Sequence, residues 1–170
     1  MLTLRLLDDE DMPSVTCWLH KEHVKRRYEI PELGITIHDW LCEISARKEA
    51  FHWITYNIVL FQDKPIGLCL FYRCADSDED YGTLPIAGSY GIDYLIGEEA
   101  YLGKGLGKAL ITLLVDRIFA IPDAQRVTAD IANDNAASRQ ALLSCGFVLV
   151  DADHNRYMKG KASNALERLL

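Results

Sequence analysis

The sequence contains no long apolar run and no paired-cysteine motif. No hydrophobic segment approaches the roughly 20 residues that span a bilayer, so we expect no membrane association. Residues 1–13, MLTLRLLDDEDMP, are acidic where a secretory signal would be basic and then apolar. The odd number of cysteines, without a C-x-x-C, is typical of reduced thiols in a cytoplasmic protein; they are Cys17, Cys42, Cys69, Cys74 and Cys145.

Positive charge is also scarce. Asp and Glu number 25 against 18 Lys and Arg, which gives a net charge of −7. A nucleic-acid-binding domain needs a basic surface, so we expect no nucleic-acid partner. The acidic balance permits a cationic small molecule or a basic peptide as partner. Because acidity also aids solubility, charge alone does not decide whether the balance serves a function.

The pattern of apolar residues predicts an α/β protein of 170 residues with a single domain over 1–170. Strands are predicted over 1–7, 51–62, 65–73, 89–97, 125–131, 146–151 and 156–160, with a hairpin around Asp63-Lys64. Helices are predicted over 8–28 (as one or two), 36–48, 107–120 and 135–145, with a candidate short helix over 161–170. The successive strands in the middle exclude simple βαβ alternation and predict a mixed sheet with helices on both faces.

Three glycines precede the helix predicted over 107–120. In residues 98–115, EEAYLGKGLGKALITLLV, Gly103, Gly105 and Gly107 stand at alternate positions between a strand and that helix. The first N–H groups of a helix are free, its dipole is positive at that end, and glycine lets a phosphate approach without a Cβ clash. A tight turn would explain one glycine, so three favour a phosphate or pyrophosphate site.

This glycine pattern differs from two common phosphate motifs. A Walker A loop needs a hydroxyl after its lysine to bind Mg²⁺, but Ala109 follows Lys108. The dinucleotide fingerprint is G-x-G-x-x-G after an early strand, whereas the spacing here is G-x-G-x-G after the fourth predicted strand. No group of His, Cys and Asp has metal-ligand spacing either, so we expect no metal.

A second segment, TADIANDNAASRQALLSCGF over residues 128–147, places Asn135 twelve residues before Phe147. Together with YLGKGLGKAL over residues 101–110, it resembles the GCN5-related N-acetyltransferase (GNAT) family. That family has a glycine loop reading Arg/Gln-x-x-Gly-x-Gly, followed by Asn-x-x-Ala-x-x-x-Tyr-x-x-x-Gly-Phe. The resemblance implies the GNAT fold, a mostly antiparallel sheet splayed between strands 4 and 5.

The resemblance also implies acetyl-CoA as co-substrate and a set of residues that contact it. The pyrophosphate would lie on the glycine loop and the pantetheine arm would run beside the fourth strand, near the Asn segment. The implied residues are Tyr94, Leu95, Ile96, Leu102, Gly103, Lys104, Gly105, Leu106, Gly107, Lys108, Asn135 and Ser138.

Two positions depart from the family pattern. Leu102 stands where Arg or Gln is usual, a minor change because mostly backbone groups bind the phosphate. Leu142 stands where the family often has a Tyr that protonates the leaving thiolate. Tyr90, Tyr94 or a water could serve instead, and the sequence selects none of them.

The amine acceptor needs a group that can take a proton, and the fourth predicted strand carries Asp93. Asp is depleted in strands, so this residue is a candidate base; the alternative is an acid at a strand end facing solvent. Asp130, in the next predicted strand, has the same two interpretations. Both strands lead into segments implied to bind the donor, so both acids could line one cleft.

Within the family, the chain resembles the aminoglycoside 6′-N-acetyltransferases. The similar segments are WLHKEHV (18–24), DKPIGLCLFY (63–72) and GIDYLIGEEAYLGKGLG (91–107). The resemblance implies that Asp93 binds the acceptor amine and acts as base, and that Asp130 contacts the antibiotic. Trp18 and Tyr28 could stack on a sugar ring. The loop ADSDEDY could add an acidic rim of Asp76, Asp78, Glu79 and Asp80, or be a solvated loop.

Other activities remain open. Siderophore N-acyltransferases share the donor pattern but usually carry His where Asp93 stands. A polyamine, an amino sugar or a protein amine could be the acceptor, and a non-catalytic acyl-CoA-binding module is a further alternative. We expect direct transfer in a ternary complex, because Cys145 has no evident base partner for an acyl-cysteine. A monomer or a homodimer is expected.

Overall fold

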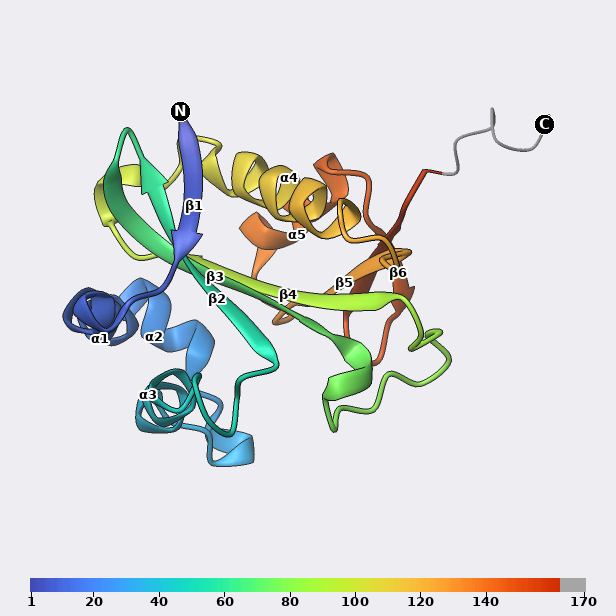
Figure 1. Cartoon of the computed structure of the whole chain (residues 1–170), viewed down its shortest axis with the longest axis horizontal. Coiled ribbons are helices and arrows are strands. Elements are labelled where there is room, and N and C mark those ends of the chain that lie inside the picture. Colours follow the sequence, from blue (N-terminus) through green and yellow to red (C-terminus); the bar gives the residue numbers. More distant parts are fainter. Residues whose placement is uncertain (163–170) are drawn as a thin grey trace.

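A mixed sheet runs through the centre of the molecule (Figure 1), and the computed structural model describes residues 1–162. Within this range seven strands occur in the order β1-β2-β3-β4-β5-β7-β6. Their bounds are β1 Leu2–Leu6, β2 Ile54–Phe61, β3 Lys64–Arg73, β4 Ser89–Ile96, β5 Arg126–Asp130, β6 Val148–Asp151 and β7 Arg156–Gly160. Each predicted strand is thus present, and β1 lies at one edge of the sheet. The short helix predicted over 161–170 lies outside the described residues, apart from its first two positions.

The sheet divides between β4 and β5. These two strands are parallel, and they pair only over Ser89–Gly91 and Arg126–Thr128. All other neighbouring strands are antiparallel. From Ile92 to Ile96, β4 pairs with β3 but not with β5, so one of its edges is open. The predicted splay between strands 4 and 5 is therefore confirmed.

Helices cover both faces of the sheet (Figure 1), as predicted. In the described residues they are α1 Met12–His20, α2 Glu22–Tyr28, α3 Ile37–Ser45, α4 Leu106–Phe119 and α5 Ala136–Ser144. The helical segment predicted over 8–28 is broken at Lys21, whose backbone is extended. Helix α3 begins with a capping box in which Thr36 and Asp39 satisfy each other's backbone N–H groups.

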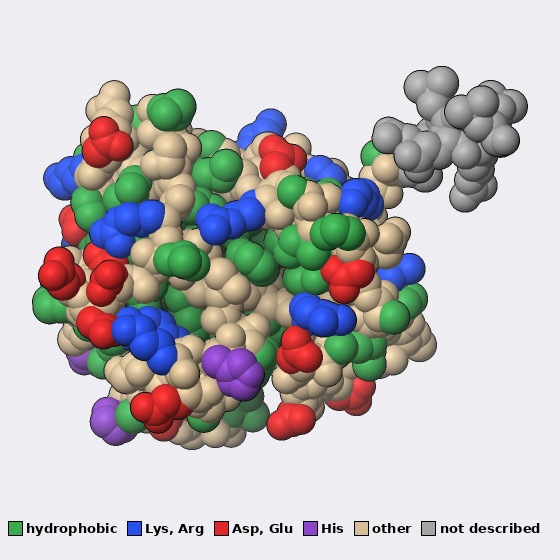
Figure 2. Space-filling model, viewed as in Figure 1, with side chains coloured by type: hydrophobic (Ala, Val, Ile, Leu, Met, Phe, Trp, Pro, Cys, Tyr) green, Lys and Arg blue, Asp and Glu red, His purple; other side chains and the backbone are tan. Residues whose placement is uncertain are grey.

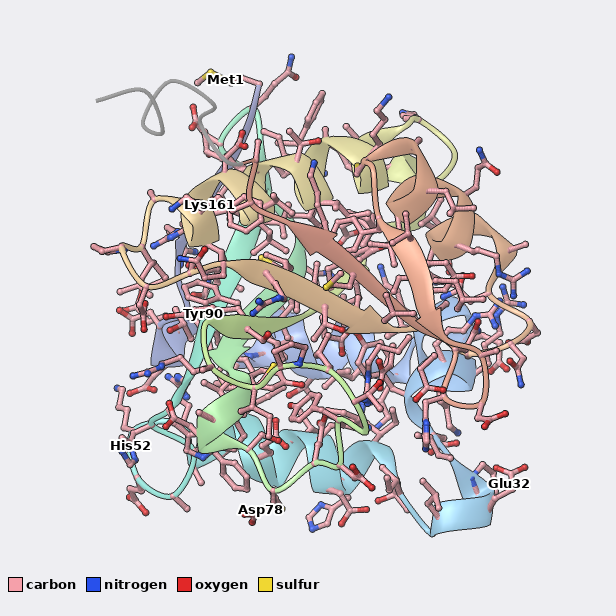
Figure 3. The ribbon with its side chains drawn as sticks, turned by 90° about the vertical axis from the view of Figure 1, so that its right-hand side faces the viewer. Met1, Glu32, His52, Asp78, Tyr90 and Lys161 are labelled. Atoms are coloured by element: carbon pink, nitrogen blue, oxygen red, sulfur yellow. The ribbon has the colours of Figure 1, made fainter. Side chains whose placement is uncertain are left out.

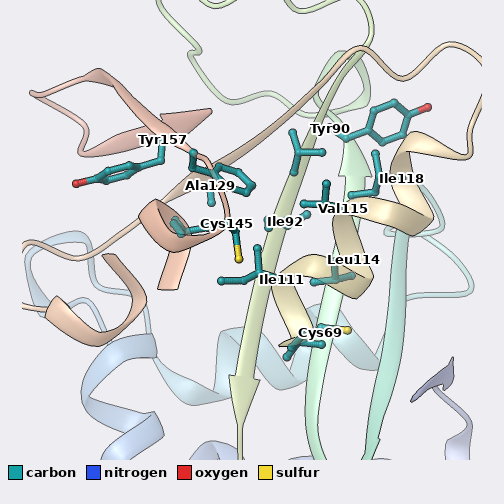
Figure 4. Packing of buried hydrophobic residues seen from close by; sticks show 14 of the residues in the cluster. Cys69, Tyr90, Ile92, Ile111, Leu114, Val115, Ile118, Ala129, Cys145 and Tyr157 are labelled. Carbon is teal, nitrogen blue, oxygen red and sulfur yellow. The ribbon is translucent and has the colours of Figure 1, made fainter. Parts of the chain in front are cut away.

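Each face of the sheet has its own apolar core. The α4–α5 core includes Ile92, Leu110, Ile111, Leu114 and Leu142 (Figure 4 shows part of it). The α1–α3 core includes Val15, Trp18, Leu19, Ile58 and Leu95. Successive residues of a strand point to opposite faces. Along β4, Tyr94 therefore packs against the α4–α5 core, while its neighbour Asp93 lies on the α1–α3 face.

The β2–β3 hairpin turns one residue earlier than the sequence suggested. Phe61 pairs with Lys64, so the two-residue loop is Gln62-Asp63, and both have positive φ (50° and 63°). Two consecutive positive φ values match the twist of a tight hairpin, and Asp tolerates this conformation better than most residues. Lys64 is thus the first residue of β3 rather than part of the turn.

The surface seen in Figure 2 mixes acidic and basic side chains rather than gathering one sign into a large patch. Among residues 1–162, no helix combines the length and apolarity needed to cross a membrane. The side view in Figure 3 places the loop that carries Asp78 at the same end of the molecule as α3. That end lies on the Asp93 side of the sheet.

Candidate active site

Asp93 lies half-buried in the middle of β4, where its side chain is held by two donors. The Tyr28 hydroxyl, at the end of α2, donates to Asp93 Oδ1 over 3.0 Å, and the backbone N–H of Tyr94 donates to the same oxygen over 2.7 Å. Trp40 of α3 fixes Tyr28 in turn. Its Nε1 donates to the Tyr28 carbonyl over 2.7 Å, and the two rings meet edge to face with centroids 5.3 Å apart.

Burial dominates the electrostatics of Asp93 and raises its pKa to about 6. The hydrogen bonds from Tyr94 N–H and the Tyr28 hydroxyl lower the pKa, because both favour the ionised form. The negative charges of Glu43 and Glu79 raise it further. A carboxyl group that titrates near neutrality can accept a proton efficiently, which is what a general base requires.

Two more tyrosine–carboxylate pairs flank Asp93. The Tyr56 hydroxyl donates to Glu43 Oε1, and the Tyr72 hydroxyl donates to Glu79 Oε1 over 3.3 Å. Burial also raises the pKa of Glu43, and the Glu79 charge adds to that rise. A small pocket of about 10 Å³, room for about one water molecule, lies at this place, lined by Leu19, Tyr28, Trp40, Ile44, Tyr56, Leu68, Cys69, Leu70, Asp93 and Tyr94. Aromatic walls and nearby carboxylates suit a cation.

The sequence did not single out Glu43, Tyr56 or Tyr72 for this site. Glu43 precedes the buried Ile44 on α3, so its side chain lies at the boundary between the apolar face of the helix and solvent. Its partner Tyr56 is on β2, and Tyr72 is on β3. Glu79, which was predicted, reaches the site from the loop after β3. No local pattern connects these elements.

Asp130 is engaged by a buried arginine. Arg156 of β7 donates through Nε to Asp130 Oδ1 over 2.7 Å and through Nη2 to Oδ2 over 2.8 Å. Arg156 is 3% exposed, donates to the Asp80 carbonyl over 3.2 Å and lies 4.9 Å from the ring centroid of Tyr81. Asp130 thus neutralises Arg156, which anchors the loop through the Asp80 carbonyl. The Asp130 side chain is still 44% exposed, so its contact with an acceptor stays a prediction.

Trp18 is a core residue rather than a stacking platform. It is 2% exposed, and its Nε1 donates to Glu98 Oε1 over 2.8 Å. Gly97 packs on its indole so closely that a Cβ there would lie 2.1 Å from Trp18 Cγ. The ring therefore offers no open face to a sugar, which corrects the expectation from the sequence. Nearby, His23 Nε2 donates to the Ile96 carbonyl over 2.9 Å, so His23 is a structural residue.

The glycine loop has the geometry of an anion site. Gly103 and Gly105 have φ values of 69° and 74°, in the left-handed region that glycine reaches without strain. Gly105 is the N-cap of α4, so the next three N–H groups have no acceptor within the helix. These groups belong to Leu106, Gly107 and Lys108. Gly107 is helical, and a Cβ there would meet no protein atom within 4 Å.

The remaining predicted donor contacts line the open edge of β4 and the start of α5. Leu95 is 6% exposed in the α1–α3 core, so only its backbone could contact a ligand. The Ile96 carbonyl is occupied by His23. Asn135 Oδ1 caps α5 by accepting from the Ser138 N–H over 3.2 Å. Leu102 and Lys104 are exposed on the glycine loop. The predicted donor residues thus lie on β4, on the glycine loop before α4 and at the start of α5, and their contact with acetyl-CoA stays a prediction.

Residues 1–162 provide neither a cluster of metal ligands nor a base beside the Cys145 thiol. No group of three or more His, Cys, Asp or Glu in this range is placed to hold a metal. The thiol of Cys145, the residue directly after α5, lies 3.7 Å from Thr112 Oγ1 and donates to the Lys108 carbonyl over 3.5 Å. Neither neighbour is a base that could activate the thiol.

Known proteins resemble the chain over most of its length. Residues 8–152 match the family model described as the acetyltransferase (GNAT) domain. Aminoglycoside N(6′)-acetyltransferase type 1 of Klebsiella pneumoniae is 28% identical over 149 residues, which cover 86% of this chain and 73% of the relative. The crystal structure of aminoglycoside acetyltransferase AAC(6′)-Ib with coenzyme A and kanamycin superposes with a TM-score of 0.79 at 25% identity, covering 99% of both chains. Spermidine N-acetyltransferase from Vibrio cholerae, solved with CoA and spermine, is similar in fold: its TM-score is 0.67 at 22% identity, with 88% of this chain and 82% of that one covered.

Proposed function

The chain belongs to the acetyltransferase (GNAT) domain family, and on that premise we propose that it transfers the acetyl group of acetyl-CoA to the 6′-amine of an aminoglycoside in a ternary complex. The observation that carries this proposal is the Asp93 carboxylate, held in an acidic, aromatic pocket beside the open edge of β4. Aminoglycosides are polycations, so carboxylates at the acceptor site favour their binding.

Acetyl-CoA, the donor, would bind on the α4–α5 side of the sheet, where β4 and β5 separate. Bound acetyl-CoA supplies an activated thioester. The free N–H groups of Leu106, Gly107 and Lys108, with the helix dipole, hold phosphate oxygens, and the exposed amines of Lys104 and Lys108 add positive charge. The open backbone groups of β4 beyond Gly91 can pair with an extended pantetheine amide chain, as a missing strand would. The orphaned, buried hydroxyl of Tyr94 lies on this side as well.

Asp93 acts on the acceptor. Its carboxylate binds the amine and takes up the proton that the nitrogen loses as the new N–C bond forms. Tyr28 and the Tyr94 N–H keep the carboxylate in one orientation, so the amine is held in a fixed position relative to the donor. Glu43 and Glu79 attract the other ammonium groups of a polycation. The five free cysteines fit a reducing compartment, and we propose a cytoplasmic location.

The test is release of the CoA thiol from acetyl-CoA in the presence of kanamycin, tobramycin, spermidine or a basic peptide. We expect the two aminoglycosides to be the fastest acceptors. Faster release with spermidine or the peptide would show that the chain is an acetyltransferase whose preferred acceptor is not an aminoglycoside. Binding of acetyl-CoA without release on any of these amines would favour a non-catalytic acyl-CoA-binding module.

A further inference from the structure

The hydroxyl of Tyr94 is buried, and no atom of residues 1–162 accepts a hydrogen bond from it. A buried hydroxyl left without a partner costs roughly 1–3 kcal/mol, so such a group needs a partner from outside these residues, a water molecule or a ligand. Tyr90 gives the contrast. It lies on the same strand and the same face, and its hydroxyl donates to Asp123 over 2.9 Å. Tyr94 lacks such an acceptor, although its strand and its face of the sheet are the same.

Tyr94 faces α5 at the open edge of β4. The Ser138 hydroxyl can donate to the phenol oxygen, which lowers the pKa of Tyr94, and the Cys145 thiol lies near enough to raise that pKa slightly through its charge. Ser138, Leu142 and Cys145 are four and three residues apart, so they share one face of the α5 region. Figure 4 shows the Cys145 sulfur directed towards β4 and Ile111. Leu142 is completely buried and carries no polar atom, so that face of α5 supplies no donor at this position.

Adjacent residues of β4 thus place two different groups on the two sides of the open edge. Asp93, on the α1–α3 side, is the proposed base for the amine, and Tyr94, on the α4–α5 side, is the orphaned donor. A thioester bound along this edge would have its carbonyl carbon near Asp93 and its sulfur near Tyr94.

We propose that the Tyr94 hydroxyl donates a hydrogen bond to the departing sulfur of CoA and stabilises the thiolate. This inference rests on the proposed function. As the amine nitrogen bonds to the acetyl carbon, the C–S bond breaks and its electron pair remains on sulfur. The proton lost by the nitrogen goes to Asp93, and the thiolate leaves with its charge compensated by the Tyr94 O–H dipole.

Complete transfer of the phenol proton to sulfur is disfavoured. Burial raises the pKa of Tyr94 to about 12, and the nearby charge of Asp93 adds to the rise, while Ser138 opposes it. An ordinary thiol titrates near 8.5, so a full transfer would run uphill by more than three pKa units. A retained hydrogen bond incurs no such penalty, and Tyr94 stays protonated over the whole range in which Asp93 works.

The test compares the wild type with Tyr94→Phe and with the control Tyr90→Phe, using titration of the bound CoA thiol. The readout is the ultraviolet absorbance of the thiolate, taken as the difference between complexes with CoA and with desulfo-CoA, which lacks the sulfur. A hydrogen bond to a charged group contributes about 1.5–3 kcal/mol, so the thiol pKa should rise by about one to two units in Tyr94→Phe. The single-turnover rate of acetyl transfer should fall roughly 10- to 100-fold. Tyr90→Phe should change neither.

The titratable groups whose charges reach Tyr94 are Asp93 on β4 and Tyr28 on α2, across the sheet, and Cys145 after α5. The desulfo-CoA reference removes their contribution. Equal thiol pKa values in wild type and Tyr94→Phe would overturn the inference, even if the variant were slow, because slowness alone fits a packing role. A shifted thiol pKa in a protein that acetylates no amine would support the inference and reject the proposed function. Failure of the wild type to bind CoA would reject both.

Discussion

The hydroxyl of Tyr28 and the carboxylate of Asp93 lie 3.0 Å apart, although 65 residues separate them in the chain. The contact joins the end of α2 to the middle of β4, and Trp40 of α3 holds Tyr28 by a hydrogen bond and a ring contact. The helices on one face of the sheet therefore fix the orientation of the acid on β4. The Asp93 carboxylate is therefore held in one position beside the place where β4 and β5 separate.

The acid limb of the pH–rate profile should respond in opposite directions to two substitutions. In the wild type, kcat/KM for the acceptor should fall as the pH drops through about 6, because Asp93 becomes protonated. Tyr28→Phe removes a hydrogen bond that favours the ionised form, so the midpoint should rise. Glu43→Gln removes a nearby negative charge, so the midpoint should fall. Each shift should be up to about one pKa unit.

Asp78→Asn is the matched control for these two variants, because Asp78 is exposed on the same loop as Glu79. It should leave the midpoint where it is. Shifts of the same sign in Tyr28→Phe and Glu43→Gln would contradict the assignment of the acid limb to Asp93.

Asp93→Asn should abolish turnover, leave CoA binding intact and raise stability in a pH-dependent way. The folded pKa of Asp93 is raised from 3.8 to about 6, so the folded state takes up a proton between these values. The protonated Asp93 carboxyl therefore stabilises the folded state at low pH, and this contribution is lost as the pH rises through about 6. The gain in Tm from Asp93→Asn should therefore be larger at pH 8 than at pH 5. An equal gain at the two pH values would show that the carboxylate is better solvated than the structure indicates.

Gly107→Ala should make the protein more stable and its CoA binding weaker. Gly107 is helical and open to solvent, so alanine should stabilise α4 by up to about 1 kcal/mol. The added methyl group would lie where the phosphate approaches the backbone. Calorimetry should show a higher Tm and a higher Kd for CoA. Gly103→Ala is the comparison, because φ of 69° strains alanine and should lower the Tm. Unchanged CoA affinity in Gly107→Ala would place the phosphate elsewhere.

Asp130→Asn should destabilise the fold, because it leaves the buried guanidinium of Arg156 without its charged partner. We expect a loss near the lower end of about 1–3 kcal/mol, since the Asp130 side chain is 44% exposed to water. The loop held through the Asp80 carbonyl should become more sensitive to proteases. Urea unfolding and limited proteolysis measure both effects. Wild-type stability combined with a raised KM for the acceptor would instead make Asp130 a direct substrate contact.

Periodicity was sufficient to predict the elements, because a strand or an amphipathic helix leaves its pattern in neighbouring residues. The strand with Asp93, the glycine loop before α4 and the hairpin of β2 and β3 all follow from such local signals. The predicted turn of the hairpin was displaced by one residue, because Gln62 has a positive φ and glutamine is not a residue type that favours this conformation.

The chemistry around Asp93 could not be predicted in the same way, because it depends on contacts between distant elements. Tyr28, Glu43 and Tyr56 reach the site from three separate segments. The pairing of Asp130 with Arg156 spans 26 residues and two strands. An acid in a strand therefore looks the same in sequence whether it is free to bind a ligand or is committed to a buried arginine.

In the proposed function Asp93 is the base for acetyl transfer to the 6′-amine of an aminoglycoside, and analysis of the reaction product shows whether this transfer occurs. Kanamycin is incubated with acetyl-CoA and a catalytic amount of wild type or Asp93→Asn, and the product is analysed by mass and NMR spectroscopy. We expect one acetyl group on the 6′-nitrogen with the wild type and no product with Asp93→Asn, at equal CoA affinity. Unmodified kanamycin with the wild type, acetylation at another nitrogen, or equal turnover by Asp93→Asn would contradict it.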